Sequence, residues 1–92
     1  RQPERMFQAQ VVRTAELMGW RVYHTHDSRR SAAGFPGLVL VRRPRVNFAE
    51  RKAERGRLTD DQRAWLHALD GCTVERYLWR PSDWQRVERI LR

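Results

Sequence analysis

The chain has 92 residues, a net charge of +8 and a pI of about 11.3, and it has no apolar run near the ~20 residues of a membrane-spanning helix. Its single cysteine, Cys72, excludes an internal disulfide framework and a cysteine-based zinc site, so we expect an intracellular protein that is not secreted. Arginine supplies eighteen of the nineteen basic side chains and binds phosphate through two hydrogen bonds, so nucleic acid is the expected partner rather than a membrane surface.

The first half of the chain predicts one helix followed by three strands. The helix begins at Pro3, continues to about Met18 and ends at Gly19, with apolar side chains at helical spacing. Alternating residues 20–25 predict the first strand. The unbroken apolar run 38–41 predicts a second strand that is covered on both faces. A basic turn then leads into a third strand that ends near residue 52.

The second half predicts two more helices around a fourth strand. Thr59 and Gln62 have the spacing of a capping box, so a helix should begin there and end at Gly71. Residues 73–79 predict a strand, and Ser82 and Gln85 repeat the capping-box spacing before a last helix. The order α-β-β-β-α-β-α predicts one α/β domain over residues 1–92, with a mixed central sheet flanked by helices.

The third predicted strand carries the acidic and basic pair Glu50 and Lys52, the latter being the only lysine. Side chains two residues apart on a strand share a face. A carboxylate beside an ammonium group suits metal-assisted phosphodiester hydrolysis, because the carboxylate holds a divalent cation and the lysine orients the attacking water. The alternative is a surface ion pair, since this triplet is short and common.

Three segments in a fixed order carry a more specific pattern, namely residues 34–41, 48–53 and 58–66. With residues 79–83, they resemble the virus-type replication-repair nuclease (VRR-NUC) family, a branch of the PD-(D/E)xK nucleases. The resemblance covers nearly the whole chain and implies a restriction-endonuclease-like core. It also implies a phage- or viral-type, structure-specific DNA endonuclease, a homodimer that cuts branched DNA such as Holliday junctions with Mg²⁺ or Mn²⁺ in the cytoplasm or nucleoid of a bacterial host.

By this resemblance, the metal ligands are the Glu50 carboxylate, the backbone carbonyl of Arg51 and an aspartate at the position of Gly37, with Lys52 and Gln62 as further catalytic residues. Gly37 replaces that aspartate, so we expect weakened metal binding and impaired cleavage. The substitution indicates either a deliberately disabled copy or a natural variant that has lost cleavage, and the retained Glu50, Lys52 and Gln62 favour the first.

Two of the candidate residues also have structural interpretations. Gln62 could serve the capping box, the site, or both. Glu4 faces the sheet on the first helix and could be an outer metal ligand, or it could be a helix-start carboxylate favoured by the helix dipole.

Basic residues in the turns are candidates for contacts to the DNA backbone, the alternative being solvated basic turns. They are Arg29, Arg30, Ser31, Arg42, Arg43, Arg45, Arg55 and Arg57. The rival interpretation from another functional class is a branched-DNA-binding module that uses a nuclease scaffold without catalysis.

Overall fold

A computed structural model describes residues 3–25 and 30–92. The element order agrees with the sequence prediction, apart from a short 3₁₀ turn before the last helix. The elements are α1 (Glu4–Leu17), β1 (Arg21–His24), β2 (Leu38–Arg42), β3 (Arg45–Arg51), α2 (Asp60–Leu69), β4 (Glu75–Trp79), η1 (Pro81–Asp83) and α3 (Trp84–Leu91). Within the described residues, no helix combines the length and apolar character needed to cross a membrane.

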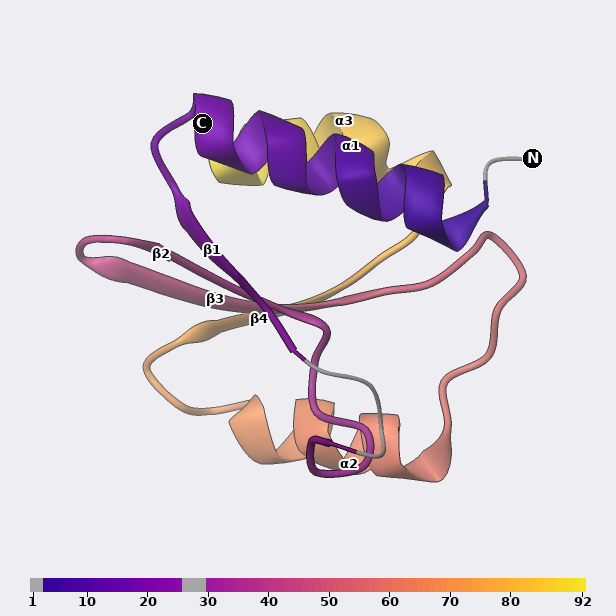
Figure 1. Cartoon of the computed structure of the whole chain (residues 1–92). Helices are drawn as coiled ribbons and strands as arrows, with labels where there is room; N and C mark the ends of the chain where they lie inside the picture. The colour runs from indigo at the N-terminus through magenta and orange to yellow at the C-terminus, as the bar shows by residue number, and fades with distance from the viewer. Residues whose placement is uncertain (1–2, 26–29) are drawn as a thin grey trace.

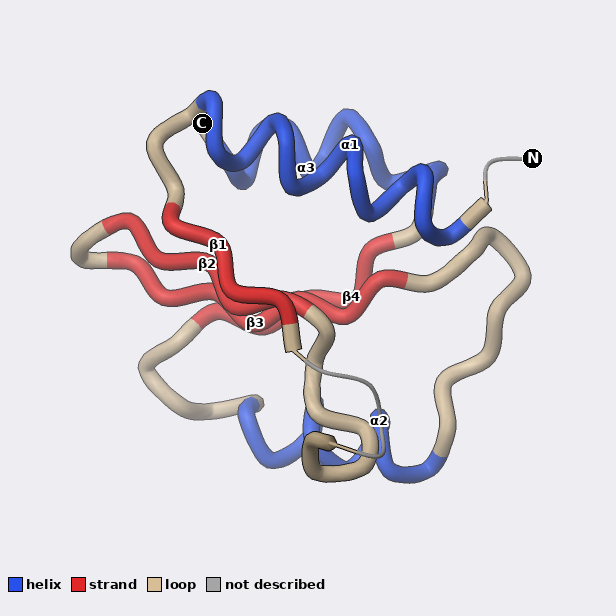
Figure 2. The backbone as a smooth tube through the Cα atoms, viewed as in Figure 1, coloured by secondary structure: helices blue, strands red, loops and turns tan. Residues whose placement is uncertain are grey.

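The four strands form one mixed sheet between two layers of helices. The strand order is β1-β2-β3-β4, with the first two pairs antiparallel and β3 parallel to β4. Helices α1 and α3 lie over one face and α2 lies on the other (Figures 1 and 2). The parallel pair requires a crossover, which α2 provides. This arrangement confirms the expected restriction-endonuclease-like α/β core.

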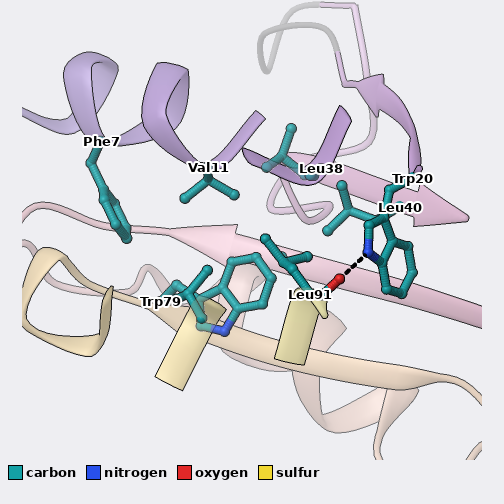
Figure 3. Close-up of a cluster of buried hydrophobic side chains, with 10 residues drawn as sticks. Phe7, Val11, Trp20, Leu38, Leu40, Trp79 and Leu91 are labelled. Carbon is teal, nitrogen blue, oxygen red and sulfur yellow. Dashed lines mark hydrogen bonds between the residues drawn. The ribbon is translucent and has the colours of Figure 1, made fainter. Parts of the chain in front are cut away.

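The hydrophobic core lies between the sheet and the α1/α3 layer (Figure 3). Its fully buried side chains are Phe7, Val11, Ala15, Leu38, Leu40, Ala49, Trp79, Val87 and Leu91. At its edge, Trp20 Nε1 donates a 2.8 Å hydrogen bond to the Leu91 carbonyl oxygen. Segments from both ends of the chain therefore close one core, which fixes β3 beneath α1.

The second strand is covered fully on one face only, so the prediction of coverage on both faces was wrong. Leu38 and Leu40 are buried, whereas Val39 and Val41 are half-buried. The reason is the position of α2, which packs against β4 and leaves the β1/β2 part of its face open. Valine is common at such half-buried strand positions, so an apolar run does not distinguish them from buried ones.

The predicted capping box at the start of α2 is confirmed. The Gln62 backbone N–H donates to Thr59 Oγ1 at 3.1 Å, and the Thr59 N–H donates to Gln62 Oε1 at 2.9 Å. These two bonds fix where α2 begins and where the Gln62 side chain lies.

The predicted cap at Ser82 was wrong. The chain turns one residue earlier, through η1, and the Arg80 backbone N–H donates to Asp83 Oδ2 at 2.9 Å. Ser82 instead donates its N–H and its hydroxyl to the Glu54 carboxylate, at 2.9 and 2.7 Å. Pro81 explains the earlier start, because its fixed φ suits the first turn of a helix.

Candidate functional site

Glu50 is the buried carboxylate of the site and is held by the start of α2. Its side chain is 7% exposed, and Gln62 Nε2 donates to Glu50 Oε2 at 3.3 Å. The same Gln62 side chain closes the capping box through its oxygen. The Gln62 amide therefore bonds the Thr59 backbone through its oxygen and Glu50 through its nitrogen, and it couples the orientation of Glu50 to the helix start.

A cavity of about 450 Å³ opens beside Glu50, at the end of β3. The cavity is lined by five of the site residues predicted from the sequence, which come from α1, β3, α2 and the segment before β2. These are Glu4, Gly37, Glu50, Arg51 and Gln62. The sheet register brings Gly37 next to Glu50, because the adjacent residues Leu38 and Ala49 are paired.

Gly37 is hydrogen-bonded to the residue after β1 and lies against the Arg51 side chain. The Thr25 N–H donates to the Gly37 carbonyl at 3.1 Å. A Cβ atom built on Gly37 would overlap Arg51 Nη2 and lie 3.3 Å from Arg51 Cζ. The guanidinium group therefore occupies the space in which a side chain at residue 37 would begin.

Arg51 is a largely buried cation, 8% exposed. Its Nη1 donates to Gln8 Oε1 on α1 at 2.5 Å, and its Nε is buried with no hydrogen-bond partner among the described residues. Gln8 also shares a 2.7 Å hydrogen bond with His24 Nδ1. Gln8 was not predicted from the sequence, although it lies one helical turn after Glu4 and so shares its face.

The two buried charged groups of the site, Glu50 and Arg51, influence each other's pKa. Burial raises the pKa of Glu50, while the charges of Arg51 and Lys52 and a hydrogen bond from the Gly37 backbone N–H oppose that rise. Burial likewise lowers the pKa of Arg51, and the charges of Glu50 and Glu4 oppose this. Each buried charge therefore depends on the other for compensation.

Lys52 lies near Glu50 but outside the cavity wall. Its backbone N–H donates to the Trp79 carbonyl at 3.0 Å, which extends the β3–β4 pairing by one bond. The aliphatic part of its side chain passes close to Gly56. Its charge acts on Glu50 electrostatically.

The residues of this cavity do not fit a divalent cation as they stand. The side chains facing it include two carboxylates, Glu4 and Glu50, and residue 37 contributes none. In residues 3–25 and 30–92, no three or more His, Cys, Asp or Glu side chains form a group suited to a metal ion. Mg²⁺ requires near-octahedral oxygen ligands, and the Arg51 guanidinium would repel it at this position.

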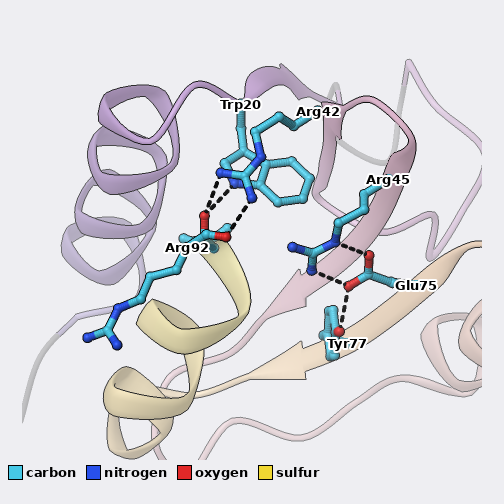
Figure 4. A network of polar contacts seen from close by, with 7 residues as sticks. Trp20, Arg42, Arg45, Glu75, Tyr77 and Arg92 are labelled. Carbon is cyan, nitrogen blue, oxygen red and sulfur yellow. Dashed lines mark hydrogen bonds and ion pairs between the residues drawn. The ribbon is translucent and has the colours of Figure 1, made fainter.

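Two of the arginines selected as DNA contacts have partners within the fold (Figure 4). Arg42 lies 4.6 Å from the Trp20 ring centroid and donates to backbone oxygens of Met18, Leu91 and Arg92. Arg42 therefore ties the β2–β3 hairpin to α3 and to the end of α1.

Arg45, in the same hairpin, is the second of them. It forms two 2.6 Å hydrogen bonds to the Glu75 carboxylate, which also accepts from the Tyr77 hydroxyl at 2.7 Å. These bonds tie the hairpin to β4.

The remaining basic candidates are in three places. Arg55 and Arg57 are exposed in the segment between β3 and α2, where Arg80 holds the backbone through bonds to the Ala53 and Gly56 carbonyls. Arg43 is exposed in the hairpin turn, at the opposite end of β2 and β3 from the cavity. Arg30 is exposed and Ser31 is half-buried, and Arg29 lies outside the described residues.

Comparison with protein-family models matches the VRR-NUC domain over residues 3–82. Neither the curated proteins nor the solved structures gave a match.

Proposed function

The chain belongs to the VRR-NUC nuclease family, and from this premise we propose that it is a structure-specific DNA endonuclease domain whose cleavage is impaired in this form. The proposed substrate is branched DNA of the Holliday-junction type. One observation carries the proposal: Glu50, Gln62 and Glu4 meet in one cavity beside Gly37, where the resemblance puts the missing aspartate. Together with the family match, this meeting of residues supports a nuclease site that lacks one carboxylate.

Charge supports DNA as the partner. The net charge is +8, and Arg55 and Arg57 follow the Glu50 strand directly, while Arg30 precedes Gly37. We assign these exposed arginines to the DNA backbone, with Ser31 as a neutral contact. Replacing Arg55 or Arg57 by alanine should reduce the slope of log K against log salt by about 0.9 for each phosphate that the variant no longer binds.

The roles within the cavity follow from the contacts of this chain. Gln62 holds the Glu50 carboxylate in one orientation through its 3.3 Å bond. The Lys52 ammonium adds positive charge close to that carboxylate, where phosphate would bring negative charge. In the intact family arrangement, an aspartate at residue 37 would join Glu50 and the carbonyl of residue 51 around Mg²⁺ or Mn²⁺.

A second candidate function is branched-DNA binding without cleavage. The observation that favours it is the Arg51 guanidinium, which lies where a side chain at residue 37 would begin. The scaffold and the exposed arginines would be the same in both cases.

The test is a panel of four-way junction, flap and plain duplex, with binding measured by fluorescence anisotropy and cleavage in Mg²⁺ and Mn²⁺. Wild type should bind the junction at least ten times more tightly than the duplex and leave it uncut. Cutting by Gly37→Asp, alone or with Arg51→Val, would support the impaired endonuclease. Tight binding with no cutting by any variant would support the binding module. Equal affinity for all three DNAs would refute both.

We further propose a homodimer, because a two-fold pair of sites matches the two strands that must be cut at a junction. Sedimentation equilibrium should give twice the 11.1 kDa chain mass. A monomer that persists when bound to the junction would exclude this assembly.

A further inference from the structure

We propose that the Arg51 guanidinium is a built-in replacement for the divalent cation of the site, and that Gly37 is the residue that makes room for it. The inference rests on the proposed function only in taking this cavity as the nuclease site. It goes further in assigning the loss of metal to two residues acting together, one that removes a ligand and one that supplies the positive charge.

A steric constraint links Gly37 and Arg51. The Arg51 guanidinium lies where a Cβ atom at residue 37 would have to be, and its Cζ would lie 3.3 Å from that atom. Glycine is therefore the residue that leaves the guanidinium its place. An aspartate at residue 37 and Arg51 in its present position exclude one another.

The charges of the cavity also favour this replacement. The Glu50 carboxylate is 7% exposed, and Glu4 faces the same cavity. A buried carboxylate requires a compensating positive charge, which a metal ion supplies in a metal site. Here the guanidinium of Arg51, 8% exposed, is the buried positive charge of the cavity.

Hydrogen bonds also hold the guanidinium in place. Its Nη1 donates to Gln8 Oε1, and Gln8 is itself hydrogen-bonded to His24. A long side chain that merely filled a gap would gain little from such a connected network, whereas these bonds fix its position between α1 and residue 37. The cation is therefore part of the folded structure.

Binding of Mn²⁺ tests this directly, without any reaction. We would compare wild type, Gly37→Asp, Arg51→Val and the double variant by isothermal titration calorimetry at low salt. The double variant should bind one Mn²⁺ per chain at least ten times more tightly than either single variant, and wild type should show no site. Arg21→Val is the matched control, because it removes an exposed strand arginine and should bind no better than wild type.

Two results would overturn the proposal. One is wild-type binding of Mn²⁺ as tight as that of the double variant. The other is equal binding by Gly37→Asp and the double variant, because Arg51 would then be no obstacle to the metal.

A measurement on wild type alone covers the case in which the variants fail to fold. Amide resonances of Gly37, Glu50 and Arg51 should keep their intensity in proton–nitrogen NMR spectra as Mn²⁺ is added. Selective paramagnetic broadening of these three amides would contradict the proposal. The DNA panel is a separate experiment, so failure to prefer junctions would count against the proposed function and leave the cation replacement standing.

Discussion

The contact between Gly37 and Arg51 makes a quantitative prediction for Gly37→Ala. The added Cβ would overlap Arg51 Nη2, so the guanidinium must move by about 1 Å to regain ordinary contact distance. That movement would weaken its 2.5 Å bond to Gln8, and complete loss of a bond to a charged group costs ~1.5–3 kcal/mol. Alanine recovers ~0.4–1 kcal/mol by restricting the unfolded chain.

The net loss in the free energy of unfolding should therefore be about 1–2 kcal/mol, which lowers the Tm of a chain this size by roughly 5–15 °C. Urea denaturation followed by tryptophan fluorescence measures it. In the Arg51→Val background, where no guanidinium occupies the space, the same alanine should be neutral or slightly stabilising. If the two substitutions add to within ~0.5 kcal/mol, the steric reasoning is refuted.

Three further predictions concern the scaffold. Arg45 lowers the pKa of Glu75, so the pair stabilises the fold above the ordinary Glu pKa of ~4.3, and this stabilisation is lost as pH falls through the lower pKa of the folded state. The difference in Tm between wild type and Glu75→Gln should therefore close in acid, and a difference that stays constant with pH would contradict the role of the pair. Gln62→Ala should cost more stability in urea than Thr59→Ala (~1 kcal/mol), because only the former frees Glu50; equal losses would refute the second role of Gln62. Leu91→Ala should cost ~2–5 kcal/mol in urea unfolding, and a loss below ~1 kcal/mol would contradict its place in the core.

Local signals in the sequence were sufficient for much of the fold. Pro3 and Gly19 bound the first helix, and Thr59 and Gln62 marked the start of α2, because caps depend on residues within one turn of each other. Glu50 was correctly predicted to lie on the third strand, where Gln62 of α2 contacts it. The order of elements followed from such signals, and the mixed sheet followed from the order.

The features that were not predicted depend on contacts between distant segments. The coverage of Val39 and Val41 is set by where α2 packs, which their own sequence does not record. Arg42 and Arg45 looked like a free basic turn, whereas Trp20 and Glu75 engage them from other elements.

Arg51 illustrates the same limit within the site. Only its backbone carbonyl was predicted to take part, because no local pattern indicates that its side chain reaches the space beside Gly37. The motif alone predicts an aspartate at the position of Gly37. The position of the Arg51 guanidinium depends on the packing of α1 against the end of β3 and on its hydrogen bond to Gln8.

The most direct test of the central claim is single-turnover cleavage of a four-way junction in Mn²⁺, at protein concentrations that saturate binding. We expect wild type to hold the junction and leave it intact, while Gly37→Asp combined with Arg51→Val cuts it. Cleavage by wild type at a rate similar to that of the double variant would contradict this expectation.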